Sequence, residues 1–110
     1  MTRRRAMPKA SRGELWMADL GFVAKTRPVL ILSVEYQQEE RAVVTYVVRT
    51  TSIRGTQYEV LHSLRGMPPG TFDAQGIASI PDLKLERRLG VVDAATLAKV
   101  EEAVRSWLAL

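Results

Sequence analysis

The sequence contains no cysteine and a single histidine, His62, among its 110 residues. Without cysteine, a disulfide framework, a thiol nucleophile and a thiolate zinc site are all excluded. One histidine and scattered carboxylates also leave few residues for a histidine-rich metal site or a Ser-His-Asp triad. We therefore expect a function that needs no metal and no cofactor. The lack of cysteine agrees with a reducing compartment, and we expect the protein to be cytoplasmic.

Glycine clusters and long apolar runs are missing as well. The seven glycines are spread singly, so the chain has no glycine-rich loop that could cradle a nucleotide phosphate. No run approaches the roughly 18 apolar residues of a membrane-spanning helix. No charged and then apolar segment of the signal-peptide type opens the sequence. A chain of this length fits one domain with one core.

What the sequence has is positive charge. Lysine and arginine number 16 against 12 acidic residues, which gives a net charge of +4 and a pI of about 9.9. A small basic domain attracts polyanions such as RNA through counterion release. Three of the arginines lie at positions 3–5, so a solubilising tail is the alternative interpretation. We expect residues 1–11 to form a flexible basic arm and residues 12–110 to form the domain.

The hydrophobic pattern predicts several short strands followed by one helix. Asp93 is a suitable N-cap, and the apolar residues after it recur at helical spacing. The segment before the third strand, 35–41, is polar and could form a helical turn. The fold class predicted is mainly β with α (α+β), a small curled antiparallel sheet or barrel. We expect strands at 14–20, 27–34, 42–49, 57–62 and 75–80.

Two of these predicted strands are flanked at one end by polar residues of types that often bind phosphate. Arg27 precedes Pro28, which fixes its own φ angle and suits the first residue of a strand. The strand 42–49 runs directly into Thr50, Thr51 and Ser52. Arginine offers a planar fork of donors for phosphate oxygens, and hydroxyl groups add further donors. This set suits RNA cleavage by the RNA's own 2′-hydroxyl, which requires positioning and charge stabilisation rather than an enzyme nucleophile.

Four segments in this order resemble the MazF/PemK family of toxin endoribonucleases. The arginine-proline start of a strand, followed at the right distance by a Thr/Ser-x-x-Arg-Gly turn, is the more specific part. The resemblance covers nearly the whole chain from residue 11 onward. The matching segments are 12–20 (RGELWMADL), 26–33 (TRPVLILS), 50–55 (TTSIRG) with 59–60 (EV) behind it, and the helix at 97–108.

The resemblance implies an SH3-like barrel with a C-terminal helix, a homodimer and a toxin of a type II toxin–antitoxin system. It implies metal-independent cleavage of single-stranded RNA to 2′,3′-cyclic phosphate and 5′-hydroxyl ends. It also implies a cognate antitoxin whose flexible acidic tail occupies the RNA groove. The catalytic arginine and threonine of the family fall on Arg27 and Thr50. We expect RNA-binding roles for Lys25, Thr26, Arg49, Thr51, Ser52, Arg54 and Gln57.

The strand order brings the two catalytic candidates together. Arg27 begins one strand, and Thr50 ends the next, which the short connection makes an antiparallel neighbour. The start of one strand and the end of its antiparallel neighbour lie at the same edge of a sheet, so we expect both side chains at one phosphate. The group that takes the 2′ proton stays open, with Glu59, His62 and water as candidates.

Two other functions remain compatible with the sequence. A gyrase poison of the CcdB type shares the fold but binds a protein and performs no RNA chemistry. A non-catalytic SH3-like module would use the same arginines only to hold phosphates or a protein partner. The hydroxyl residues after the third strand are also common turn residues.

Overall fold

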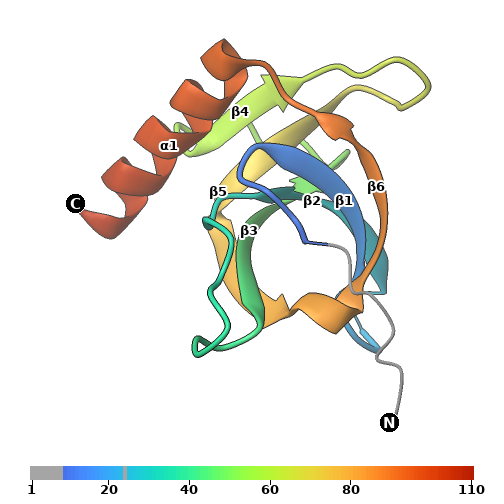
Figure 1. The fold of residues 1–110 in the computed structure, drawn as a ribbon. Coiled ribbons are helices and arrows are strands. Elements are labelled where there is room, and N and C mark those ends of the chain that lie inside the picture. Colours follow the sequence, from blue (N-terminus) through green and yellow to red (C-terminus); the bar gives the residue numbers. More distant parts are fainter. Residues whose placement is uncertain (1–8, 24) are drawn as a thin grey trace, which may run out of the picture.

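The structure, a computed structural model, describes residues 9–23 and 25–110. Over these ranges the chain forms a curled β-sheet, and one helix lies outside it against β4 and β5 (Figure 1). The predicted arm lies outside the described residues over positions 1–8, whereas Ala10 is buried in the core. The elements are β1 (Glu14–Asp19), β2 (Thr26–Ile31), β3 (Val43–Thr50), β4 (Glu59–His62), β5 (Gly70–Pro81), the 3-10 helix η1 (Asp82–Lys84), β6 (Leu85–Val91) and α1 (Ala94–Leu108).

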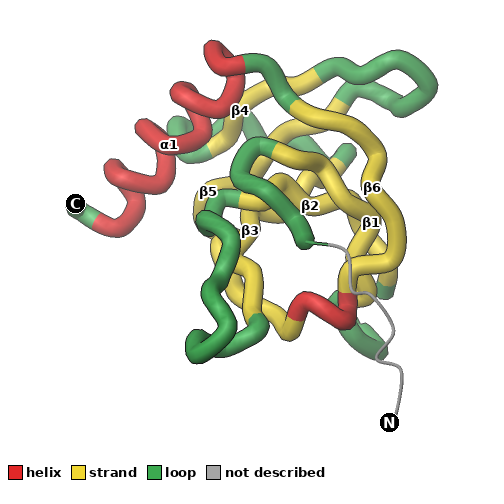
Figure 2. Tube along the Cα trace, in the orientation of Figure 1, coloured by secondary structure: helices red, strands yellow, loops and turns green. Residues whose placement is uncertain are grey.

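The strands form a single antiparallel sheet in the order β4-β5-β3-β2-β1-β6. β4 and β6 are the two edges, and in the described part of the chain they do not pair with each other. The sheet is therefore curled but open, as the tube in Figure 2 shows. This arrangement confirms the predicted class, a small barrel-like β fold with a C-terminal helix. No helix among the described residues is long and apolar enough to cross a bilayer.

Both faces of the sheet are buried, because apolar residues fill successive positions of the central strands. On β2, Val29 and Ile31 belong to one cluster with Trp16, while Leu30 belongs to the other with Leu15. The period of two along a strand sends neighbouring side chains to opposite faces. The second cluster also contains Val100 of α1, so the helix covers one face of the sheet. The two cores hold β2 and β3 rigidly in the centre.

Most of the predicted elements are confirmed, although β2 ends at Ile31 rather than at residue 34 and β4 begins at Glu59 rather than at residue 57. Three further differences are larger. β5 begins at Gly70, well before the predicted residue 75, and the charged strand β6 was not predicted. β6 is missed because an edge strand with few buried residues lacks an apolar alternation. The segment 35–41 forms a turn closed by the Glu40 amide and the Gln37 carbonyl, not a helix. Asp93 caps α1 as predicted, its carboxylate accepting from the Thr96 amide at 2.8 Å.

Candidate active site

Arg27 and Thr50 lie at the same end of the two central strands, each two residues beyond the last pair of the β2–β3 ladder, Val29 and Val48. Val29 pairs with Val48, and Leu30 pairs with Val47. Continuing this antiparallel register by two residues places Arg27 beside Thr50. Arg27, Val29 and Ile31 share one face of β2, because side chains alternate along a strand. Val29 and Ile31 are fully buried, so they hold in place the strand that carries Arg27. The juxtaposition that the strand order predicts is therefore present in the fold.

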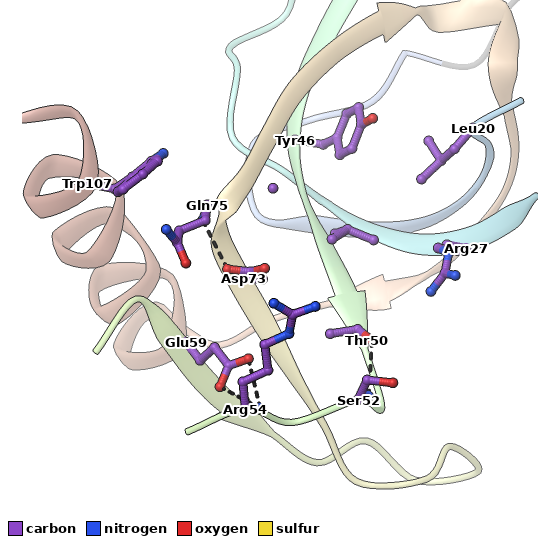
Figure 3. A pocket seen from close by; sticks show the side chains of 12 residues that line it. Leu20, Arg27, Tyr46, Thr50, Ser52, Arg54, Glu59, Asp73, Gln75 and Trp107 are labelled. Atoms are coloured by element: carbon purple, nitrogen blue, oxygen red, sulfur yellow. Dashed lines mark hydrogen bonds between the residues drawn. The ribbon is translucent and has the colours of Figure 1, made fainter. Parts of the chain in front are cut away.

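Both residues line a cleft of about 630 Å³ between the sheet and the end of α1 (Figure 3). On β3, the alternate residues Tyr46, Val48 and Thr50 form one wall of this cleft, because they share one face of the strand. Its chemistry is mixed, with two guanidinium groups, three hydroxyls and two carboxylates. The lining residues are Leu20, Arg27, Tyr46, Val48, Thr50, Ser52, Arg54, Glu59, Asp73, Gln75, Gly76 and Trp107.

A second depression of about 320 Å³ shares Arg27 and Thr50 with the cleft. The two residues thus stand where the two hollows meet. Of the residues predicted to bind RNA, Ser52 and Arg54 line the cleft, whereas Gln57 lies on the exposed turn before β4 and lines neither hollow. The second depression is lined by Lys25, Thr26, Arg27, Pro28, Arg49, Thr50, Thr51, Met67 and Pro68.

The hydroxyl of Thr50 is oriented by the turn that follows β3. The Ser52 amide donates to Thr50 Oγ1 at 3.1 Å. A threonine hydroxyl that accepts from an amide still has its own hydrogen to donate. This local bond therefore directs Thr50 as a donor toward a ligand in the cleft. The bond is of the kind that makes threonine a common turn residue, and it leaves the hydroxyl hydrogen of Thr50 available.

Glu59 anchors the loop that carries Arg54. Its carboxylate accepts from the backbone amides of Arg54, Gly55 and Thr56, at 2.6 Å for Gly55. Burial raises the pKa of Glu59, but these amides and the charge of Arg54 outweigh it, and the pKa lies below its ordinary value. Glu59 is thus an ionised anchor that holds the Arg54 backbone at the cleft.

Arg49 lies on the other face of β3 from Thr50. Its side chain is 3% exposed, and it donates to His62 Nδ1 at 2.9 Å, to the His62 carbonyl at 3.0 Å and to the Pro68 carbonyl at 2.8 Å. Burial lowers the pKa of Arg49. The side chain reaches the edge of the second depression, but its donors tie β3 to the loop between β4 and β5. Arg49 is therefore buried, unlike Lys25 and Arg54, the exposed cations that are also predicted to bind RNA.

Of the two side chains considered as proton acceptors, Glu59 lines the cleft and His62 does not. The imidazole of His62 packs on Phe72 with ring centroids 4.7 Å apart, and its Nδ1 is occupied by Arg49. Burial first, and then the charge of Arg49, lower the pKa of His62, with Asp93 acting in the opposite direction. His62 belongs to the supporting structure beneath the site.

Sequence reasoning did not find Asp73 and Trp107 as lining residues. Asp73 pairs with Val48 on one side and Glu59 on the other, at a β-bulge between β3 and β5. A bulge redirects side chains, and it carries no clear signal in a single sequence. Trp107 continues the apolar spacing of α1, yet it is 42% exposed at the cleft. Among the described residues, no three His, Asp or Glu side chains gather where they could hold a metal ion.

The sequence of the chain matches the model of the PemK-like, MazF-like toxins of type II toxin–antitoxin systems over residues 11–108. The match spans almost the whole chain, and the chain therefore belongs to this family. This confirms the resemblance that the sequence motifs indicated. No curated protein matches the sequence at a significant level.

Solved structures of the same fold include an endoribonuclease in complex with its cognate antitoxin from a mycobacterial species. It is 29% identical, with a TM-score of 0.79 over 92% of this chain and 96% of that chain. The toxin MazF-mt6 of Mycobacterium tuberculosis is also 29% identical, with a TM-score of 0.76 over 88% and 97%. A MazE-MazF structure from Deinococcus radiodurans, 23% identical with a TM-score of 0.76 over 94% and 98%, shares the fold.

Proposed function

We propose that the protein is an endoribonuclease that cleaves single-stranded RNA by attack of the RNA's own 2′-hydroxyl, with Arg27 and Thr50 acting on the scissile phosphate. The observation that carries the proposal is that both residues line both hollows, at the end of the two central strands just beyond the Val29–Val48 pair. The mycobacterial structures that resemble this chain are endoribonucleases, which supports the same activity here.

In this reaction the 2′-oxygen forms a bond to phosphorus and the bond from phosphorus to the 5′-oxygen breaks. The products are a 2′,3′-cyclic phosphate and a 5′-hydroxyl. Negative charge accumulates on the non-bridging oxygens of the phosphorane, where a guanidinium fork and a hydroxyl donor are most useful. Arg27 supplies the fork and Thr50 supplies the hydroxyl. No enzyme nucleophile and no metal enter this scheme.

The 2′ proton must pass to an acceptor as the oxygen attacks, and the leaving 5′-oxygen must gain a proton. A guanidinium offers five N–H donors and no acceptor, so in this scheme Arg27 stabilises charge and is not the base. Glu59 is at the cleft, but its oxygens are occupied by three amides and its lowered pKa weakens it as a base. We therefore assign this transfer to water.

The first prediction tests the two proposed catalytic residues. Arg27→Ala and Thr50→Ala should each lower the cleavage rate of a long single-stranded RNA by about 100-fold or more, the scale of losing one oxyanion donor. Affinity for a 2′-O-methyl RNA, which lacks the nucleophile, should fall far less. Arg27→Lys should not restore full activity, because the planar fork is lost. A folded alanine variant that cleaves at nearly the wild-type rate would show that the site is wrong.

The assay is performed with EDTA present and the product ends are identified. Cleavage in EDTA with cyclic phosphate ends supports the proposal. Intact RNA together with inhibition of gyrase indicates the CcdB-type function, and RNA binding without cleavage indicates a non-catalytic module. As a matched control, Lys99→Ala removes a cation from the exposed face of α1, which does not line the cleft, and should leave cleavage unchanged.

We further propose that the active species is a homodimer in the cytoplasm and that a cognate antitoxin protein inhibits it. Support for the antitoxin comes from the toxin family itself and from the related endoribonuclease solved with its own antitoxin. The cations that the cleft offers to RNA would serve equally to bind a flexible acidic segment.

A further inference from the structure

Trp107 stands at the end of the cleft away from Arg27. It is 42% exposed although tryptophan is the largest apolar side chain of the helix, and it lines the cleft with Asp73 and Gln75 (Figure 3). The last turn of α1 is ordered by the amide of Ala109, which donates to the Arg105 carbonyl. A flat aromatic surface is thus presented to a polar cleft by a rigid helix end.

Tyr58 fixes the orientation of this indole. The two rings meet edge to face, with centroids 5.3 Å apart and an interplanar angle of 63°. Tyr58 itself is held to β5, because its carbonyl accepts from the Ala74 amide at 2.9 Å. The pair joins the turn before β4 to α1. Trp107 is therefore packed against an aromatic neighbour and still lines the cleft.

The polar groups divide the cleft into two chemically different ends. Arg27, Thr50 and Ser52 offer donors to a phosphate at one end. At the other end Asp73 lies directly opposite Glu59 across the β4–β5 pair. The amides of the 54–56 loop and the charge of Arg54 act on Glu59, so Asp73 is the carboxylate that disfavours a second phosphate beside Trp107. An uncharged, planar group with N–H donors fits between Asp73 and Trp107. A nucleobase has this chemistry, and stacking of unpaired bases on aromatic side chains is a general mode of single-strand binding.

We infer that Trp107 is a base-stacking platform and that Asp73 selects a base carrying an exocyclic amino group. Asp73 Oδ1 accepts a hydrogen bond from the backbone amide of Gln75. The carboxylate has further lone pairs that can accept hydrogen bonds from a nucleobase. Cytosine, adenine and guanine present amino donors, whereas the edge of uracil is dominated by two carbonyl oxygens that repel a carboxylate. This inference rests on the proposed function, because it assigns one base of the same RNA.

The test uses a short 2′-O-methyl oligocytidylate, which the enzyme cannot cleave, and follows tryptophan fluorescence. Trp16 is 4% exposed in the core, so a change on binding reports on Trp107. Binding should quench the fluorescence, and Trp107→Ala should weaken affinity by about 5- to 100-fold, the range for one base–aromatic stack. Trp107→Phe should keep most of the affinity but lose the quenching.

Leu108→Ala is the matched control, because Leu108 is 44% exposed on the same helix turn and does not line the cleft. It should bind the oligocytidylate as the wild type does. Oligouridylate should bind the wild type more weakly than oligocytidylate, and Asp73→Asn should remove this preference, since an amide both donates and accepts. Absence of quenching, or equal losses in Trp107→Ala and Leu108→Ala, would overturn the stacking platform. Equal binding of the two oligomers by the wild type would overturn the role of Asp73.

Cleavage of a long RNA is measured in parallel, so that the two ideas fail separately. A protein that cleaves RNA but shows no quenching retains the proposed function and loses the stacking platform. A protein that binds the oligocytidylate with quenching but cleaves no RNA retains the platform and loses the catalytic proposal.

Discussion

At the scale of single residues, Arg49 and Thr50 show how adjacent positions acquire different tasks. Thr50 faces the cleft, and Arg49 faces the opposite side of β3, where its guanidinium joins β3 to His62 and Pro68. A buried charge is tolerated when its donors are satisfied. We interpret Arg49 as a positioning residue that fixes the end of β3 and thereby the backbone of Thr50.

Gly70 provides the space for this arginine. A Cβ built on Gly70 would lie 2.6 Å from Arg49 Nη1 and 2.9 Å from the Thr50 carbonyl oxygen. The carbonyl belongs to a central strand and cannot move away cheaply. We predict that Gly70→Ala lowers the free energy of unfolding by about 1–3 kcal/mol, the usual cost of overpacking, and also lowers RNA cleavage.

Gly90→Ala is the control for this substitution, because a Cβ there meets nothing within 4 Å. It should change the free energy of unfolding by less than about 0.5 kcal/mol. Urea denaturation of both variants measures the difference. Equal midpoints for the two variants would contradict the proposed crowding at Gly70.

The single histidine gives the stability a defined pH dependence. Burial and Arg49 lower the pKa of His62 below its ordinary value of 6.5, and Asp93 opposes them. Because the folded state resists protonation, the stabilising contribution is complete above pH 6.5 and is lost as pH falls through the lowered pKa. We predict a lower free energy of unfolding at about pH 5.5 than at about pH 7.5.

His62→Gln keeps an acceptor for Arg49 but does not titrate in this range. This variant should show a much flatter profile between the same two pH values in urea denaturation. The ordinary pKa values of the carboxylates lie lower, so they contribute less over this interval. A wild-type profile as flat as that of His62→Gln would contradict the role given to this hydrogen bond.

At the scale of elements, α1 depends on its N-cap and on its contacts with β4 and β5. Asp93 accepts from the Thr96 amide, and hydrogen bonds from the Thr96 side chain first, and then from its amide, lower the pKa of Asp93. We predict that Asp93→Ala lowers the urea midpoint, because an amide of the first turn loses its acceptor, while Asp93→Asn retains most of the stability. Ala95→Ser, on the exposed side of the same turn, is the control and should have a smaller effect. Equal midpoints for Asp93→Ala and the wild type would contradict the capping role.

At the scale of the whole molecule, the open sheet leaves two edges. Leu61 on β4 is 72% exposed and Val91 on β6 is 59% exposed. Edge strands with exposed apolar residues are sites where another chain can pair or pack. We predict a homodimer with twice the 12.3 kDa mass of one chain, measured by light scattering at micromolar concentration. A mass of one chain throughout that range would contradict the prediction.

The sequence by itself determined the class of fold and the positions of the two catalytic candidates. Apolar runs such as 29–32, the proline at the start of β2 and the capped amphipathic helix are local signals, and local signals can be read from neighbouring residues. The location of Arg27 and Thr50 at the same end of two neighbouring strands followed from strand order alone. The family match rests on these same segments.

Tertiary structure decided what depends on distant neighbours. Arg49 and Arg54 lie five residues apart and look alike in the sequence, yet Arg49 is buried against His62 whereas Arg54 lines the cleft. The bulge between β3 and β5 brought Asp73 into the site, and the packing of α1 on β4 and β5 exposed Trp107. These outcomes depend on register and on helix placement, which are set by the fit of whole elements, so no local pattern of the sequence encodes them.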